Sequence, residues 1–148
     1  MNRFSAIDQA KKRTTAELKQ LVAENGKSEY QLHCQIIQLI ERCKINGLRV
    51  WHTPNSWISI KNGKKDFVQA ARFKAMGCVP GVPDLILSWP GHVGFIEVKS
   101  AKGGLTDPQG AFLDDVRGHG HYTAVVKSLS EATAILEAWG AIRAKVAA

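Results

Sequence analysis

Segments in which apolar residues recur at helical spacing alternate along this chain with short stretches that are almost wholly apolar. The patterns Ser28-x-x-Gln31 and Ser128-x-x-Glu131 are typical of capping boxes and mark two helix starts, while glycines mark helix ends. Helices are predicted over residues 5–24, 28–47, 66–76, 106–118 and 128–145.

Strands are predicted between these helices. Residues 48–53 and 122–128 each fit one strand, and residues 81–100 fit two strands joined near Pro90-Gly91. Residues 54–65 are expected to be a loop or an irregular strand. This order of elements predicts an α/β protein with a central mixed β-sheet flanked by helices on both faces.

The hairpin GVPDLILSWPGHVGFIEVKS, residues 81–100, carries charges that an apolar hairpin does not need. If the chain turns between Pro90 and Gly91, Asp84 lies opposite Glu97, with Cβ atoms about 5 Å apart. A two-residue loop with proline first does not suit the primed turns, so the four-residue loop WPGH is expected. Two carboxylates that close repel each other unless a cation or a shared proton lies between them.

Lys99, one step further along the same face, is not expected to fill that gap alone. A hard divalent cation fits better, because all-oxygen ligation favours Mg²⁺ or Mn²⁺ over zinc. Glu29 is a candidate third carboxylate, because helical spacing places it on the same face as Ile36 and Ile40. Alternatively, Glu29 only complements the positive end of the helix dipole.

Composition and charge narrow the class of protein. The 148-residue chain is 45% hydrophobic and 22% charged, as expected of one soluble globular domain, and its net charge of +7 suits a polyanionic partner. We expect no membrane association, because there is no long apolar run and the N-terminus lacks the apolar core of a signal peptide. The odd number of cysteines, three, without a C-x-x-C pair, predicts reduced thiols and a cytoplasmic location.

Pro83-Asp84, followed by Glu97-Val98-Lys99, resembles the PD-(D/E)XK nuclease motif. The wider frame is similar to the VRR-Nuc family of that superfamily, through SEYQLHCQIIQLI, HTPN, AARFKAMGCVPGVPDLIL, GFIEVKSAKGGLTDPQ and AVVKS. The resemblance covers about residues 28–138. It implies a restriction-endonuclease-like fold, with residues 1–148 forming a single nuclease domain and residues 1–26 an N-terminal helical extension.

The resemblance also implies roles for individual residues. Asp84, Glu97 and the carbonyl of Val98 would hold the metal, and Glu29 would complete the site directly or through water. Lys99 would orient or polarise the attacking water and offset charge on the phosphate. The reaction implied is in-line hydrolysis of a phosphodiester that leaves 5′-phosphate and 3′-hydroxyl ends.

Gln109 matches a helix glutamine of the family that helps place the nucleophile or the phosphate. Alternatively, Gln109 belongs to a capping box with Thr106. The family takes its name from a Val-Arg-Arg segment near the last strand. This chain has Val126-Lys127-Ser128 there, or Val125-Val126-Lys127 in a shifted register. Either alignment keeps one positive charge, and a role of the second arginine does not carry over.

Lysines in and after the middle of the chain are candidates for phosphate contact, although such clusters are also typical of solvated faces. Lys61, Lys64 and Lys65 surround Gly63, and Lys102 lies beside Gly103-Gly104. The predicted DNA-binding set is Lys61, Lys64, Lys65, Lys102 and Lys127.

Other residues have weaker assignments. His52 is either a substrate contact or a structural histidine, and His119-Gly120-His121 is expected to be a turn rather than a metal site. Trp57 is a candidate for base stacking, whereas Trp139 is expected in the core.

The predicted function is a Mg²⁺- or Mn²⁺-dependent DNA endonuclease, with flaps and four-way junctions as candidate substrates. The alternative is a catalytically inactive DNA-binding module with the same fold. The complete set of Asp84, Glu97 and Lys99 favours the enzyme, because a binding module gains nothing from an acidic pocket that faces a polyanion. Homodimer formation is a further expectation from the family.

Overall fold

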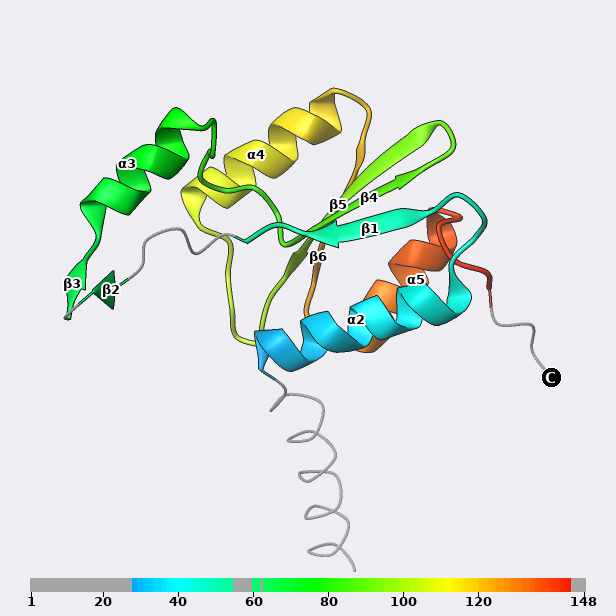
Figure 1. Ribbon diagram of the computed structural model, residues 1–148. Helices are drawn as coiled ribbons and strands as arrows, with labels where there is room; N and C mark the ends of the chain where they lie inside the picture. Colours follow the sequence, from blue (N-terminus) through cyan, green and yellow to red (C-terminus); the bar gives the residue numbers. More distant parts are fainter. Residues whose placement is uncertain (1–27, 55–59, 62, 145–148) are drawn as a thin grey trace, which may run out of the picture.

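The computed structural model describes residues 28–54, 60–61 and 63–144, with the backbone alone described at residues 60 and 61 (Figure 1). The helix predicted over residues 5–24 and the base-stacking candidate Trp57 lie outside the described residues.

A four-stranded mixed sheet forms the centre of the protein. Its strand order is β1-β4-β5-β6, in which the first two pairings are antiparallel and the β5–β6 pairing is parallel. A separate two-stranded hairpin pairs β2 with β3. The strands span Arg49–His52 (β1), Ile60–Lys61 (β2), Lys64–Lys65 (β3), Leu85–Trp89 (β4), His92–Val98 (β5) and Tyr122–Val126 (β6).

Helices cover both faces of this sheet, as the sequence predicts. Figure 1 shows α2 and α5 on one face and α4 on the other, while α3 stands beside the sheet next to the β2–β3 hairpin. The helices span Glu29–Cys43 (α2), Phe67–Ala75 (α3), Asp107–Gly118 (α4) and Leu129–Ala138 (α5).

The hydrophobic core lies between the sheet and the α2–α5 pair. Alternate residues of β4, beginning with Leu85 and Leu87, are buried toward these helices, and Ile96 and Val98 of β5 join them. The intervening residues face α4, where the ring of Phe95 contacts Phe112 at a centroid distance of 5.7 Å. Since Glu97 is two residues beyond Phe95, it also points toward α4.

The predicted register of the hairpin is confirmed, because Leu85 pairs with Ile96 and Ile86 with Phe95. The four-residue loop is wrong: Trp89 pairs with His92, so the loop is only Pro90-Gly91. Gly91 has φ = +79°, and proline followed by a glycine with positive φ is the combination of a type II turn rather than a primed one.

Two helices end earlier than predicted. Helix α2 ends at Cys43 instead of near Gly47, because Lys44 turns extended and forms a bridge with Ile142. Helix α5 ends at Ala138 instead of near residue 145. Two residues after this end, Gly140 has φ = +68°. Trp139 is half-buried against the core, as expected.

Candidate active site

Asp84 is positioned by backbone hydrogen bonds from two neighbouring strands. Its Oδ2 accepts a hydrogen bond of 2.9 Å from the N–H of Val98. Its carbonyl accepts one of 2.9 Å from the N–H of Thr53, which follows β1. Thr53 also donates its hydroxyl to the carbonyl of Pro83. Asp84 is therefore fixed just before β4 begins, beside the C-terminal end of β5.

Glu97 is the most deeply buried charged residue among the described part of the chain, with only 1% of its surface exposed. Its Oε1 forms an ion pair with Nζ of Lys99 at 2.8 Å and accepts a hydrogen bond of 2.5 Å from Nε2 of Gln109. Its Oε2 is buried and has no hydrogen-bond partner. Because an unpaired buried carboxylate oxygen is costly, this atom is a ready ligand for a cation.

The pKa of Glu97 is raised above its usual value. Burial is the largest cause, since it disfavours the charged form, and the nearby charge of Asp84 adds to it. The hydrogen bond and charge of Lys99 oppose this rise without cancelling it. The two carboxylates therefore interact unfavourably, as expected from their opposed positions.

The pKa of Lys99 is also raised. Burial acts to lower it, but the hydrogen bond and charge of Glu97 outweigh burial, with help from Glu29 and Asp84. Lys99 is therefore held as an ammonium among carboxylates. The ammonium of Lys99 thus reaches Glu97, but it satisfies only one of the two carboxylate oxygens, so it does not fill the gap alone.

Gln109 makes the capping-box contact that was one of its two alternatives, and it also contacts Glu97. Its role toward the nucleophile or the phosphate stays a prediction. Its Oε1 accepts a 2.9 Å hydrogen bond from the N–H of Thr106, which is the capping-box contact. Its Nε2 donates to Glu97. Helix α4 is held close to the hairpin at Gly81, where an added Cβ would lie 2.3 Å from the carbonyl oxygen of Pro108. With φ = +85°, Gly81 permits this approach.

Glu29 reaches the same region from the other face of the sheet. Its Oε1 accepts a 3.1 Å hydrogen bond from the N–H of Ser100, just after β5. Glu29 also lines a cavity of about 250 Å³. The residues that line it are Glu29, Tyr30, His33, His52, Asp84 and Val98.

His33 and His52 are the residues of this region that sequence reasoning missed or left open. Nδ1 of His52 lies 3.1 Å from the carbonyl oxygen of Asp84, and the two imidazole rings meet edge to face at 4.8 Å. The pKa of His33 is lowered, first by burial and then by His52, against an opposing effect of Asp84. The spacing of Glu29 and His33, one helical turn apart, was the available signal for His33.

The donor set fits a hard divalent cation. Asp84, the unpartnered Oε2 of Glu97 and the Val98 carbonyl that follows Glu97 in the chain are all oxygen donors. In the part of the chain that the structure describes, no group of three or more His, Cys, Asp or Glu side chains clusters closely enough to hold a metal. Among the described residues, the carboxylates of Glu29, Asp84 and Glu97 therefore do not form a three-carboxylate metal site.

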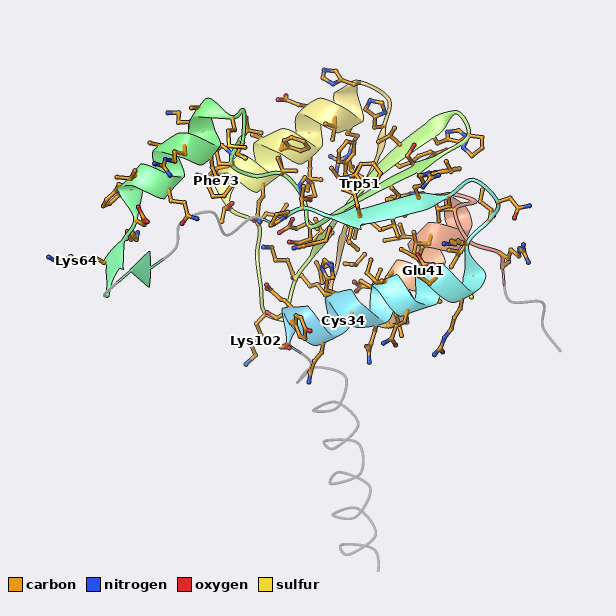
Figure 2. The ribbon with its side chains drawn as sticks, viewed as in Figure 1. Cys34, Glu41, Trp51, Lys64, Phe73 and Lys102 are labelled. Atoms are coloured by element: carbon orange, nitrogen blue, oxygen red, sulfur yellow. The ribbon has the colours of Figure 1, made fainter. Side chains whose placement is uncertain are left out.

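The predicted DNA-binding lysines are not gathered into one patch. Lys64, Lys65, Lys102 and Lys127 are all exposed, and the side chain of Lys61 is outside the described part. Figure 2 shows Lys64 at the tip of the β2–β3 hairpin and Lys102 beside the N-terminal end of α2. The N–H of Lys127 donates to Glu131 at 2.7 Å, which caps the start of α5.

The remaining sequence expectations concern turns and thiols. Helix α4 ends at Gly118 and Gly120 has φ = +87°, so His119-Gly120-His121 is a turn as expected. Cys34, Cys43 and Cys78 are free thiols.

The family model described as the VRR-NUC domain matches residues 15–129. The chain belongs to the VRR-NUC family. The predicted family is thereby confirmed, and the match begins before the expected residue 28 and ends before residue 138. Membership indicates a nuclease-type function with DNA as the substrate.

A solved structure described as "VRR_NUC domain protein" resembles this chain with a TM-score of 0.58 and 21% sequence identity. The match covers 75% of this chain and 86% of the other. At this identity the likeness concerns the fold, and it agrees with the predicted restriction-endonuclease-like fold. No curated protein matches the chain. Among the helices in the described residues, none has the length and apolar character needed to cross a membrane.

Proposed function

We propose that this VRR-NUC protein is a divalent-metal-dependent DNA endonuclease. The observation that carries the proposal is the buried Glu97 carboxylate, which has one oxygen paired with Lys99 and Gln109 and the other without a partner. A protein gains no stability from such an oxygen, because its desolvation is not repaid by a hydrogen bond. A cation bound between Glu97 and Asp84 would supply the missing interaction.

Asp84, Glu97 and the Val98 carbonyl would hold Mg²⁺ or Mn²⁺, since hard oxygen ligands favour these ions. When bound, the ion would lower the pKa of a water molecule and offset charge on the phosphate. Glu29 is proposed to contribute through water, because its carboxylate already accepts the N–H of Ser100.

The side chains of the protein would position the reactants. Lys99, held as an ammonium beside Glu97, is placed to donate a hydrogen bond to the attacking water or to a phosphate oxygen. Gln109 fixes the rotamer of Glu97 through the amide contact and is itself fixed by Thr106. In the proposed hydrolysis the water oxygen bonds to phosphorus as the bond to O3′ breaks, which leaves a 3′-hydroxyl and a 5′-phosphate.

The decisive experiment is a cleavage assay on single-stranded, duplex, flap and four-way-junction DNA, with Mg²⁺ or Mn²⁺ against EDTA. We expect cleavage with metal and none with EDTA. Asp84→Asn should be inactive, whereas Asp115→Asn on the exposed surface of α4 is the matched control and should cut normally. DNA binding without cleavage of any substrate would favour the alternative, a DNA-binding module with the nuclease fold.

Several finer features belong to the same proposal. Three points stay predictions: a preference for flaps or four-way junctions, a role in DNA repair or recombination, and a cytoplasmic location. Homodimer formation, which was expected from the family, has no support in the described residues. It is testable by sedimentation equilibrium.

A further inference from the structure

Helix α3 has two large apolar residues, Phe67 and Val68, that are exposed to solvent. Phe67 is 72% exposed and Val68 is 66% exposed, and no residue of the helix is buried. The half-buried positions are Gln69, Ala70 and Phe73, at helical spacing along the inward face. The outward face thus presents two large adjacent hydrophobic side chains to solvent, an arrangement that indicates a binding surface.

Positive charges surround these two side chains. Lys64 and Lys65 precede them on β3, and Arg72 and Lys74 follow within two helical turns, all of them exposed. None of the four takes part in an ion pair within the described residues. The nearest carboxylate in sequence, Asp66, caps the helix by accepting the N–H of Gln69 at 3.0 Å. We call residues 63–74, which carry Phe67, Val68 and these four cations, the basic arm.

The chain that follows the basic arm leads directly into the candidate active site. After the arm the chain runs through Gly81 to Asp84, and Gly81 packs against Pro108 in the first turn of α4. Gln109, the next residue, contacts Glu97. In Figure 1, α3 lies on the side of the molecule where α4 begins, and the β2–β3 hairpin lies farther out at the other end of α3. A polymer bound at the carboxylates can therefore extend along the arm.

Charge complementarity identifies the occupant of this face. A symmetric dimer through α3 would place the face against its own copy, so four cations would meet four like charges. DNA avoids that repulsion, because its phosphates pair with the cations while its bases offer flat apolar surfaces to an aromatic ring.

We propose that the basic arm binds unpaired bases of DNA, with Phe67 stacking on a base and Val68 packing beside it. Lys64, Lys65 and Arg72 would contact the flanking phosphates. The arm would thus select DNA that contains unpaired bases near the cleavage point over a fully paired duplex. The inference rests on the proposed function only in taking DNA as the ligand.

The test measures binding in EDTA, so that no cleavage is involved. The probes are a paired duplex and the same duplex with a short bubble that contains 2-aminopurine. Wild type should bind the bubble more tightly and quench 2-aminopurine by stacking. Phe67→Ala should bind the bubble about tenfold more weakly and lose the quenching, with little change on the duplex. Phe67→Trp should restore both.

Two further variants separate stacking from charge and from general apolar contact. Lys64→Ala combined with Lys65→Ala should weaken both probes and flatten the salt dependence, while keeping the quenching. Met76→Ala is the matched control, because Met76 is 78% exposed at the other end of α3, about 13 Å from Phe67 at 1.5 Å per residue. It should behave as wild type.

Equal weakening of both probes by Phe67→Ala, or no weakening of either, would overturn the proposal. So would a wild-type dimer that Phe67→Ala dissociates in sedimentation, because a second copy would then cover the face. Failure of the nuclease assignment looks different: wild type would show bubble-selective, Phe67-dependent binding and yet cut no DNA with Mg²⁺ or Mn²⁺.

Discussion

Gln109 donates its side-chain amide to Oε1 of Glu97 over 2.5 Å, while its own carbonyl oxygen caps the N–H of Thr106. One side chain therefore links the first turn of α4 to the buried carboxylate of the candidate active site. The orientation of the Glu97 carboxylate therefore depends on a side chain that also caps helix α4.

Replacing Gln109 separates its two roles. Gln109→Glu keeps a capping-box acceptor but replaces the amide donor with a third carboxylate. We expect cleavage to fall about 10- to 100-fold, as is typical when a residue supporting a metal ligand is lost. Thermal unfolding should show whether capping survives. Cleavage by Gln109→Glu at the wild-type rate would mean that Gln109 acts on α4 alone.

Asp84→Asn should abolish cleavage and leave the fold intact. The asparagine oxygen can still accept the N–H of Val98, and the change removes a charge that raises the pKa of Glu97. The metal-free variant should therefore be at least as stable as wild type in thermal unfolding. Cleavage equal to wild type under Mg²⁺ would contradict the assignment of Asp84 as a ligand.

Lys99→Ala should retain metal binding in calorimetry and lose turnover by orders of magnitude, because the ligands are neighbouring oxygens. Without metal it should also be destabilised by about 3–5 kcal/mol, since it leaves the buried Glu97 charge unpaired. Combining Lys99→Ala with Glu97→Gln should recover much of that loss. If the folded fraction of Lys99→Ala cuts normally, Lys99 serves only as a structural counter-ion.

The raised pKa of Glu97 predicts a pH dependence of stability in the metal-free protein. Between the usual pKa of a glutamate and the raised one, the folded protein binds a proton that the unfolded chain has released. Stability therefore falls as pH rises through this window. Urea unfolding across the window should show the fall in wild type and a smaller one in Glu97→Gln. Saturating Mg²⁺ should reduce it as well, since the ion stabilises the charged carboxylate.

The opposed carboxylates of Asp84 and Glu97 could be predicted from sequence, because the position of the turn in a hairpin determines which residues of the two strands pair. Once the chain turns at Pro90-Gly91, Asp84 and Glu97 must be opposed, and alternation sends Phe95 and Glu97 to the same face. The four-residue loop was wrong, because Pro90 and a Gly91 with positive φ join the strands in two residues without a primed turn.

Contacts made between elements distant in the chain could not be predicted in the same way. His33 of α2 and His52 of β1 meet only in the folded chain, and local spacing contains no information about that ring contact. The early end of α2 likewise depends on the bridge between Lys44 and Ile142 near the other end of the chain. Gln109 can cap α4 and contact Glu97 together, because an amide offers a donor and an acceptor at once.

The dispersed lysines lead to a prediction about salt. If Lys61, Lys64 and Lys65 each contact a phosphate, replacing all three with alanine should flatten the plot of log affinity against log salt by about 2–3 units on duplex DNA. Single-turnover cleavage at saturating DNA should change little, because the carboxylates are untouched. Lys102→Ala is the comparison, since Lys102 is exposed beside the N-terminal end of α2 rather than on the β2–β3 hairpin. An unchanged slope in the triple variant, with a flatter slope in Lys102→Ala, would indicate that the DNA phosphates contact the loop that follows β5. A flatter slope in the triple variant places these contacts along the hairpin that leads into α3.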